Sequence, residues 1–133
     1  MRNAFALAVS SLLVLVLITV TGQTAEPKKP DNLMKRKLEH SQKVLDGIAT
    51  EDFKKIEAGA EELIEISKQA EFQTLKTRDY ERYSLDFKRS AEGLIAASKK
   101  KNIDAAALSY VDMTLTCVKC HKHVRDSRMT GFD

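Results

Sequence analysis

The residues with the clearest chemical meaning lie near the C-terminal end, where the chain reads Cys117-Val118-Lys119-Cys120-His121. Thiols three positions apart lie on one face of a helix, so both can reach one edge of one macrocycle. The pattern C-x-x-C-H is the attachment signature of a c-type haem. In such a site the two thiols add across the porphyrin vinyl groups as thioethers, and His121 binds the iron through an imidazole nitrogen. The motif therefore predicts one covalently bound haem c.

Three other uses of the same side chains are weaker. A closed zinc site needs four ligands, and a chain with two cysteines and three histidines would have to recruit His40 or His123. A dithiol redox pair usually opens a helix that follows a strand, and no strand is expected before this motif. A disulfide between Cys117 and Cys120 would close a very small loop and stabilise little. Haem attachment is thus the preferred interpretation.

Residues 1–25 have the pattern of a secretory signal peptide. Arg2 supplies a positive charge, and the stretch from Ala4 to Val20 is apolar apart from two serines and one threonine. Cleavage after Gly22 or after Ala25 fits the pattern, and no cysteine stands there for a bacterial lipid anchor. An uncleaved membrane anchor is the alternative, although the apolar run is slightly short for a span of ~20 residues. Export to a periplasm agrees with the motif, because covalent c-type haem is installed on the outer side of the energy-transducing membrane.

The composition indicates one small domain with a mixed, solvated surface. The 133 residues include 22 Lys and Arg against 19 Asp and Glu, a formal charge of +3, and loss of residues 1–25 would leave about +2. Interleaved charges differ from the clustered basic face of a nucleic-acid-binding protein, so nucleic acid is not an expected partner. We expect a disordered lead at 26–30, a domain at 31–126 and a polar tail at 127–133.

Long stretches with helical periodicity account for this domain. The four helices are expected to begin at Asp31 or Asn32, at Thr50, at Thr77 and at Asn102, with a loop at about 70–76. The expected inward stripes are Met34, Leu38, Ser41, Leu45, Ile48; Phe53, Ile56, Ala60, Leu63, Ser67; Tyr80, Tyr83, Phe87, Ala91, Leu94, Ser98; and Ile103, Ala106, Tyr110, Met113, Cys117, Cys120, Val124. Four helices with short connections predict an all-α, antiparallel up-down-up-down four-helix bundle.

This topology positions the candidate haem ligands. The end of the last helix would lie beside the start of the first, so that His121 and Met34 face each other across the haem. Leu38, one turn after Met34, would pack against the ring. The wall of the pocket is expected from the end of the second helix and the start of the third, at Leu63, Ile66, Ala70, Phe72, Tyr80, Tyr83 and Phe87.

The combination resembles the cytochrome c-prime family of exported four-helix haem proteins, in which the attachment motif lies near the end of the fourth helix. At the level of the motif the match comprises Cys117, Cys120, His121 and Arg125, since a basic residue commonly follows the ligand histidine by four positions. The resemblance implies that Arg125 contacts a haem propionate or holds the His121 region. Members with a methionine on the first helix have six-coordinate, low-spin iron suited to electron transfer, and Met34 resembles this pattern.

The expected function is therefore a periplasmic mono-haem electron carrier rather than an enzyme, with His121 and Met34 as axial ligands and with transient redox partner proteins. Met/His ligation raises the haem potential. If Met34 does not bind, Leu38 becomes the distal blocker, and a five-coordinate cytochrome that binds nitric oxide or carbon monoxide is the alternative. Solvation is expected for Lys35, Arg36 and Lys37. The alternatives are a position near the haem propionates and an encounter surface for an acidic partner. A homodimer through the first two helices, as in the resembled family, stays open.

Overall fold

The computed structural model describes residues 32–69 and 75–131. Over these ranges the chain is all-helical and contains no strand; its helices are α2 (Leu33–Ala49), α3 (Phe53–Lys68), α4 (Arg78–Lys99) and α5 (Ile103–Thr130). The expected signal peptide, the lead at 26–30 and the pocket candidates Ala70 and Phe72 lie outside the described residues. None of the described helices is both long and apolar enough to cross a membrane.

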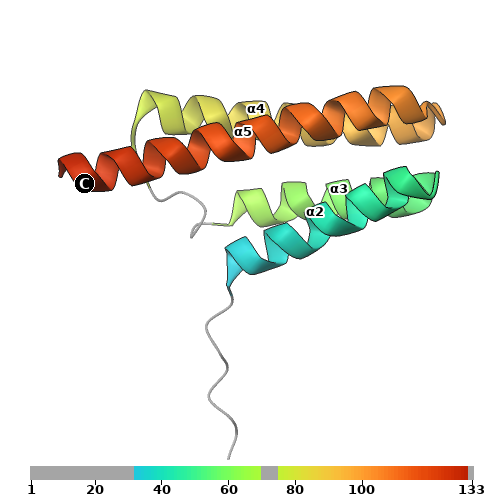
Figure 1. Cartoon of the computed structure of the whole chain (residues 1–133), viewed down its shortest axis with the longest axis horizontal. Helices are drawn as coiled ribbons and strands as arrows, with labels where there is room; N and C mark the ends of the chain where they lie inside the picture. Colours follow the sequence, from blue (N-terminus) through green and yellow to red (C-terminus); the bar gives the residue numbers. More distant parts are fainter. Residues whose placement is uncertain (1–31, 70–74, 132–133) are drawn as a thin grey trace, which may run out of the picture. The chain divides into compact units, whose positions relative to one another are not determined.

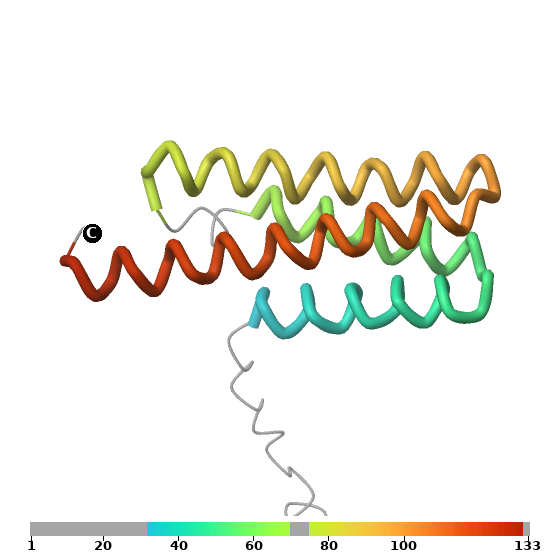
Figure 2. Tube along the Cα trace, turned by 45° about the horizontal axis from the view of Figure 1, so that its top comes forward, coloured from blue at the N-terminus to red at the C-terminus, as the bar shows by residue number. Residues whose placement is uncertain are grey.

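The four helices pack side by side, an arrangement consistent with a four-helix bundle (Figures 1 and 2). The pair α4 and α5 packs most extensively, and α3 packs against both α2 and α4, whereas α2 meets α5 over a short stretch only. All four helices contribute to one buried core, which consists of Val44, Ile56, Ala60, Leu63, Phe87, Leu94, Ala97, Ala106 and Met113. The inward stripes predicted for α3, α4 and α5 are buried or half-buried, so those three predictions are confirmed.

A side-chain cap begins each helix. The side chains of Asn32, Asp52, Thr77 and Asn102 each accept a hydrogen bond from the backbone N–H three residues later, which satisfies one of the N–H groups that a helix start leaves without a partner. The predicted starts at residues 32, 77 and 102 are thereby confirmed. The predicted start at Thr50 is wrong, because Asp52 is the cap and α3 begins at Phe53.

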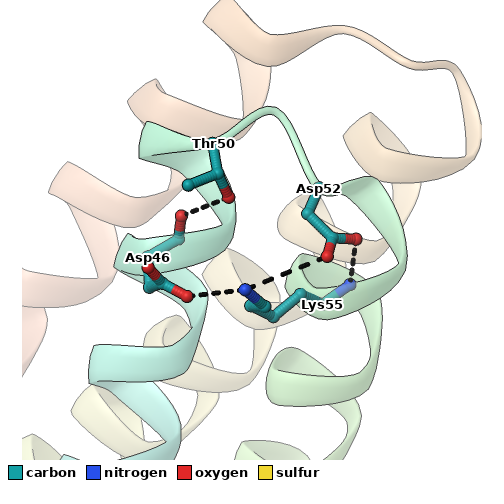
Figure 3. A network of polar contacts seen from close by, with 4 residues as sticks. All are labelled: Asp46, Thr50, Asp52 and Lys55. Atoms are coloured by element: carbon teal, nitrogen blue, oxygen red, sulfur yellow. Dashed lines mark hydrogen bonds and ion pairs between the residues drawn. The ribbon is translucent and has the colours of Figure 1, made fainter.

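Polar contacts explain why the turn between α2 and α3 takes this form (Figure 3). The Thr50 hydroxyl donates back to the carbonyl of Asp46 (2.8 Å), so Thr50 closes α2 instead of opening α3. Lys55, on the first turn of α3, donates from Nζ to the carboxylate of Asp46 at 2.7 Å. That hydrogen bond raises the pKa of Lys55. Glu51 takes a positive φ of 53° between the two helices, the left-handed conformation in which the chain reverses.

The buried face of α2 differs from the predicted one. Three members of the predicted stripe, Met34, Leu38 and Leu45, are exposed. The buried residues of α2 are Leu33, Val44 and Gly47. The physical reason is close helix packing at two glycines. A Cβ added at Gly47 would lie 2.9 Å from Ile56 Cγ1, and one added at Gly59 would lie 2.7 Å from Val44 Cγ2. The helix therefore turns its glycine and valine side toward α3.

We expect Gly59→Ala to lower the free energy of unfolding by about 1–3 kcal/mol, because the new methyl group would overlap Val44, which is fully buried and β-branched. Urea unfolding followed by circular dichroism would measure this. Gly93→Ala is the matched control: its Cβ would meet only the Ser109 side chain, which can rotate, so the helix-propensity gain of about 1 kcal/mol is retained. Both variants share the gain in helix propensity, so equal stability of Gly59→Ala and Gly93→Ala would contradict the close-packing explanation of the α2 face.

The polar tail predicted from residue 127 is also wrong for most of its length. Helix α5 continues through Thr130 and ends at Gly131, which caps it in the left-handed conformation with φ 69°. Ser127 is buried. Arg128 lies in the last turn, where a cation interacts favourably with the helix dipole. In both views these last turns of α5 extend past the start of α2 (Figures 1 and 2).

Candidate functional site

A cavity of about 390 Å³ lies among the four helices and collects most of the predicted site residues. Its lining comes from the first half of α2, one residue of α3, the first half of α4 and the stretch of α5 from Tyr110 to Arg128. The lining residues are Met34, Lys37, Leu38, Ser41, Leu63, Tyr80, Tyr83, Phe87, Tyr110, Met113, Thr114, Thr116, Cys117, Cys120, His121, Val124 and Arg128. This volume lies within the range of roughly 300–1,000 Å³ that is usual for small-molecule and cofactor sites.

Both cysteines of the motif face the cavity from one side of α5. Cys117 and Cys120 are half-buried free thiols, and Cys117 also packs against the core. Burial raises the pKa of each thiol, and the nearby cation of Lys37 acts in the opposite direction. The thiols are therefore positioned by the helix to react with one ligand in the cavity, and they remain largely protonated at neutral pH.

His121 follows on the same helix, lines the cavity and is more exposed than the cysteines. Burial, together with the cations of Lys37 and Arg125, lowers its pKa. A lowered pKa keeps the imidazole neutral near pH 7, which is the form that binds a metal ion. Arg125 does not line the cavity, contrary to its prediction as a cofactor-binding residue. Arg125 lies one turn after His121, and its cation acts on that imidazole, so the alternative prediction that Arg125 influences the His121 region fits its position.

The two predicted residues of α2 line the same cavity as the motif. Met34 is 41% exposed and Leu38 is 59% exposed, and both line the cavity. Met34 thus shares one cavity with His121 without being locked into the core. Met113, the other methionine of the lining, is buried in the core on α5.

Aromatic side chains of α4 form a further wall. Tyr83 and Phe87, together with Tyr80, line the cavity as predicted. Ile66, also expected there, is instead fully buried beside the core. Tyr110 was placed in the α5 stripe but not at the site; its hydroxyl lies 3.3 Å from that of Ser41, a hydrogen bond that links α5 to α2.

His123 and His40 lie outside the cavity lining. His123 Nε2 is hydrogen-bonded to the hydroxyl of Thr77 at 2.7 Å, and its ring meets Tyr83 edge-on at 6.0 Å between centroids. These contacts fix the start of α4 against α5. Neither histidine therefore joins the two cysteines, as the zinc alternative would require.

Lys37, for which solvation was the preferred expectation and a place near the haem propionates an alternative, lines the cavity. Its Nζ lies 3.5 Å from the centroid of the Phe87 ring, within the range of a cation–π contact. Burial lowers its pKa to about 8, against the opposing influence of the two cysteines. The available signal was its spacing: residues 34, 37, 38 and 41 share one helix face. The helical pattern counts only apolar residues as facing inward, so it places a lysine on that face in solvent.

The lowered pKa of Lys37 predicts a pH effect on the free energy of unfolding of the chain by itself. The folded chain releases this proton near pH 8 and the unfolded chain near pH 10.5. Over that interval the unfolded state binds more protons, so the free energy of unfolding rises with pH, by about 1–3 kcal/mol in total. Lys37→Met should abolish that rise, as measured by urea unfolding from pH 7 to pH 10.5.

The thiols act oppositely, since their raised pKa lowers stability above pH 9. They are present in both proteins, so their contribution largely cancels when the two profiles are compared. Parallel profiles for wild type and Lys37→Met would show that Lys37 is solvated.

Comparison with protein-family models, with curated proteins and with solved structures finds no match for this chain. The chemistry of the site is therefore argued from its own residues. Two thiols on one helix face, an imidazole kept neutral and a thioether on the opposite helix surround a cavity whose other walls are mainly apolar or aromatic. These donors fit a flat, largely apolar ligand that is attached through two carbon–sulfur bonds and carries a metal ion.

Proposed function

We propose that this chain is an exported mono-haem c-type cytochrome that transfers electrons, built on an antiparallel up-down-up-down four-helix bundle. The connections of three residues between α2 and α3 and between α4 and α5 favour this topology, because so short a link requires the second helix to return beside the first. The N-terminal pattern of residues 1–25 favours export to a periplasm. The chemistry of electron transfer needs no catalytic residues.

One observation carries this proposal: Cys117, Cys120, His121 and Met34 line the same cavity, although Met34 lies more than eighty positions before the motif. The motif by itself concerns only five consecutive residues. A chance C-x-x-C-H would not be expected to face a cavity of cofactor size that is also lined by a methionine from a distant segment.

Different residues of the cavity would bind different parts of the haem. The thiols of Cys117 and Cys120 would carry the haem as thioethers, with each S–H adding across one vinyl double bond. His121 would supply one axial nitrogen, and the Met34 sulfur would supply the other ligand. When bound, the haem iron supplies a reversible one-electron change. The aromatic wall of Tyr80, Tyr83 and Phe87 would exclude water from the ring, which together with Met/His ligation favours a raised potential.

Transient docking to a redox partner would occur at the cavity end of the molecule. Three exposed cations are close in sequence to residues of the site: Lys35 on α2, and Lys119 and Arg125 on α5. Such a surface favours encounter with an acidic partner and makes the association rate fall with ionic strength.

An absorption spectrum of the purified protein tests this function. We expect a low-spin ferric haem with a methionine-to-iron charge-transfer band, and a reduced form that does not readily bind carbon monoxide. A preparation from cells able to attach c-type haem that contains none would overturn the proposal.

A second candidate, a five-coordinate cytochrome that binds nitric oxide or carbon monoxide, is favoured by one observation. Met34 is 41% exposed, and Leu38 beside it reaches the same cavity. If Leu38 rather than Met34 covers the iron, the ferric spectrum is high-spin and carbon monoxide binds on reduction. The same spectrum therefore separates the two candidates.

A further inference from the structure

The outer face of α5 is apolar, and no described helix covers it. Leu108, Val111, Leu115 and Val118 are 72, 55, 52 and 60% exposed, respectively. Successive members are three or four residues apart, so they form one continuous stripe along the helix. Scattered exposed apolar residues are ordinary, whereas a continuous stripe indicates an interaction surface. We call these four residues the α5 outer stripe.

The α5 outer stripe has a charged residue of opposite sign at each end. Asp104 precedes Leu108 by four positions, and Lys122 follows Val118 by four positions; both are exposed. From Asp104 to Lys122 the steps are four, three, four, three and four. The spacing is therefore the same when read in either direction, with its centre at position 113.

We propose that a second copy of this chain docks on the α5 outer stripe, with the two α5 helices antiparallel about a two-fold axis near position 113. Such an interface is self-complementary, as two-fold symmetry requires. Leu108 of each copy would meet Val118 of the other, and Val111 would meet Leu115. Leucine and valine at three- and four-residue spacing are the side chains that pack in paired helices.

Charge selects the antiparallel direction. When the helices are antiparallel, Asp104 of each copy faces Lys122 of the other, which makes two attractive pairs. When they are parallel, Asp104 faces Asp104 and Lys122 faces Lys122, which are two repulsive pairs. Lys122 also contacts Asp126 one turn later at 2.9 Å, and its ammonium group has three donors, so one contact does not prevent the other.

Other exposed apolar residues fit a dimer less well. Those of α2 are Met34, Leu38 and Leu45, of which the first two line the cavity. α4 offers Leu85 among the large ones. The α5 outer stripe is the longest continuous set on any described helix, and its charged ends are those that a second copy would complement. The proposal does not depend on haem, so it can fail or succeed independently of the proposed function.

Sedimentation equilibrium of the protein as isolated tests the proposal, over concentrations from about 1 µM to about 1 mM. We expect the measured mass to approach twice that of one chain. Leu115→Glu should weaken the dimer at least about tenfold, because it places two uncompensated carboxylates in the interface. Leu45→Glu on α2 is the matched control, with 49% exposure against 52% for Leu115, and should not change the mass. Circular dichroism of each variant checks that the helices persist.

Charge reversal tests the direction. Asp104→Lys and Lys122→Asp should each weaken the dimer by about tenfold at low salt, since each turns two attractive pairs into repulsive ones. The double variant should restore the wild-type dissociation constant. A single-chain mass at every concentration, or dissociation by Leu45→Glu but not by Leu115→Glu, would overturn the proposed interface. Failure of the double variant to restore it would overturn the antiparallel register.

Discussion

We expect that replacing both Cys117 and Cys120 with alanine releases the haem completely on extraction with acidic acetone, whereas the wild-type chain keeps it. The two thiols face one cavity from the same side of α5, so together they would form both covalent bonds to the ring. Alanine is tolerated in a helix, and both positions are only half-buried, so the fold should persist. Absorbance of the extracted chain and of the solvent phase measures the partition.

Two controls sharpen this result. Cys117→Ala and Cys120→Ala singly should each retain haem through one remaining bond, with a shifted absorption maximum. Thr114→Ala changes an exposed residue of the same lining on the same helix and should leave attachment intact. Haem that stays with the doubly substituted chain after extraction would refute the thioether linkage.

The second large effect concerns Met34. We expect Met34→Leu to convert a low-spin, six-coordinate spectrum into a high-spin, five-coordinate one, with loss of the methionine-to-iron charge-transfer band. Leucine has nearly the same volume but no donor sulfur, and the site is partly exposed, so the helix should tolerate the change. The reduction potential should fall, because Met/His ligation raises it. Carbon monoxide should then bind readily to the reduced protein.

Another methionine provides the control for Met34. Met129 is 85% exposed and lies outside the cavity lining, so Met129→Leu should leave the spectrum unchanged. If Met34→Leu also leaves it unchanged, the sixth ligand is another residue. Lys37 would then be examined first, because its amine reaches the same cavity from the same helix.

The local elements of this protein follow closely from short-range sequence. Asn32, Thr77 and Asn102 begin their helices as predicted, because a capping side chain acts within three residues of the group it satisfies. The misplaced start of α3 has a local cause as well. Thr50 and Asp52 both qualify as caps, and the choice depends on how α2 ends and on Lys55 reaching back to Asp46.

The inward face of α2 was less accessible to prediction than those of the other three helices. The α2 pattern gave Leu38 and Leu45 as buried, yet close approach at Gly47 and Gly59 turns Val44 inward and leaves those leucines exposed. A glycine carries no apolar signal in the pattern, although it decides where two helices come closest. The apolar residues of α5 cover more than one face, so periodicity identified the inward stripe and overlooked the outer one.

The sequence by itself carries the C-x-x-C-H motif on which the haem proposal rests, and it determined the existence of four helices and most of their starts, because these depend on residue type and on neighbours within a few positions. Only the tertiary structure decided which side chains share the cavity. Lys37, which was expected in solvent, contacts the Phe87 ring in the structure. Arg128 lines the cavity, whereas Arg125 does not. The physical reason is that helix rotation depends on packing between distant segments, and a rotation of one residue, about 100°, exchanges one face for another.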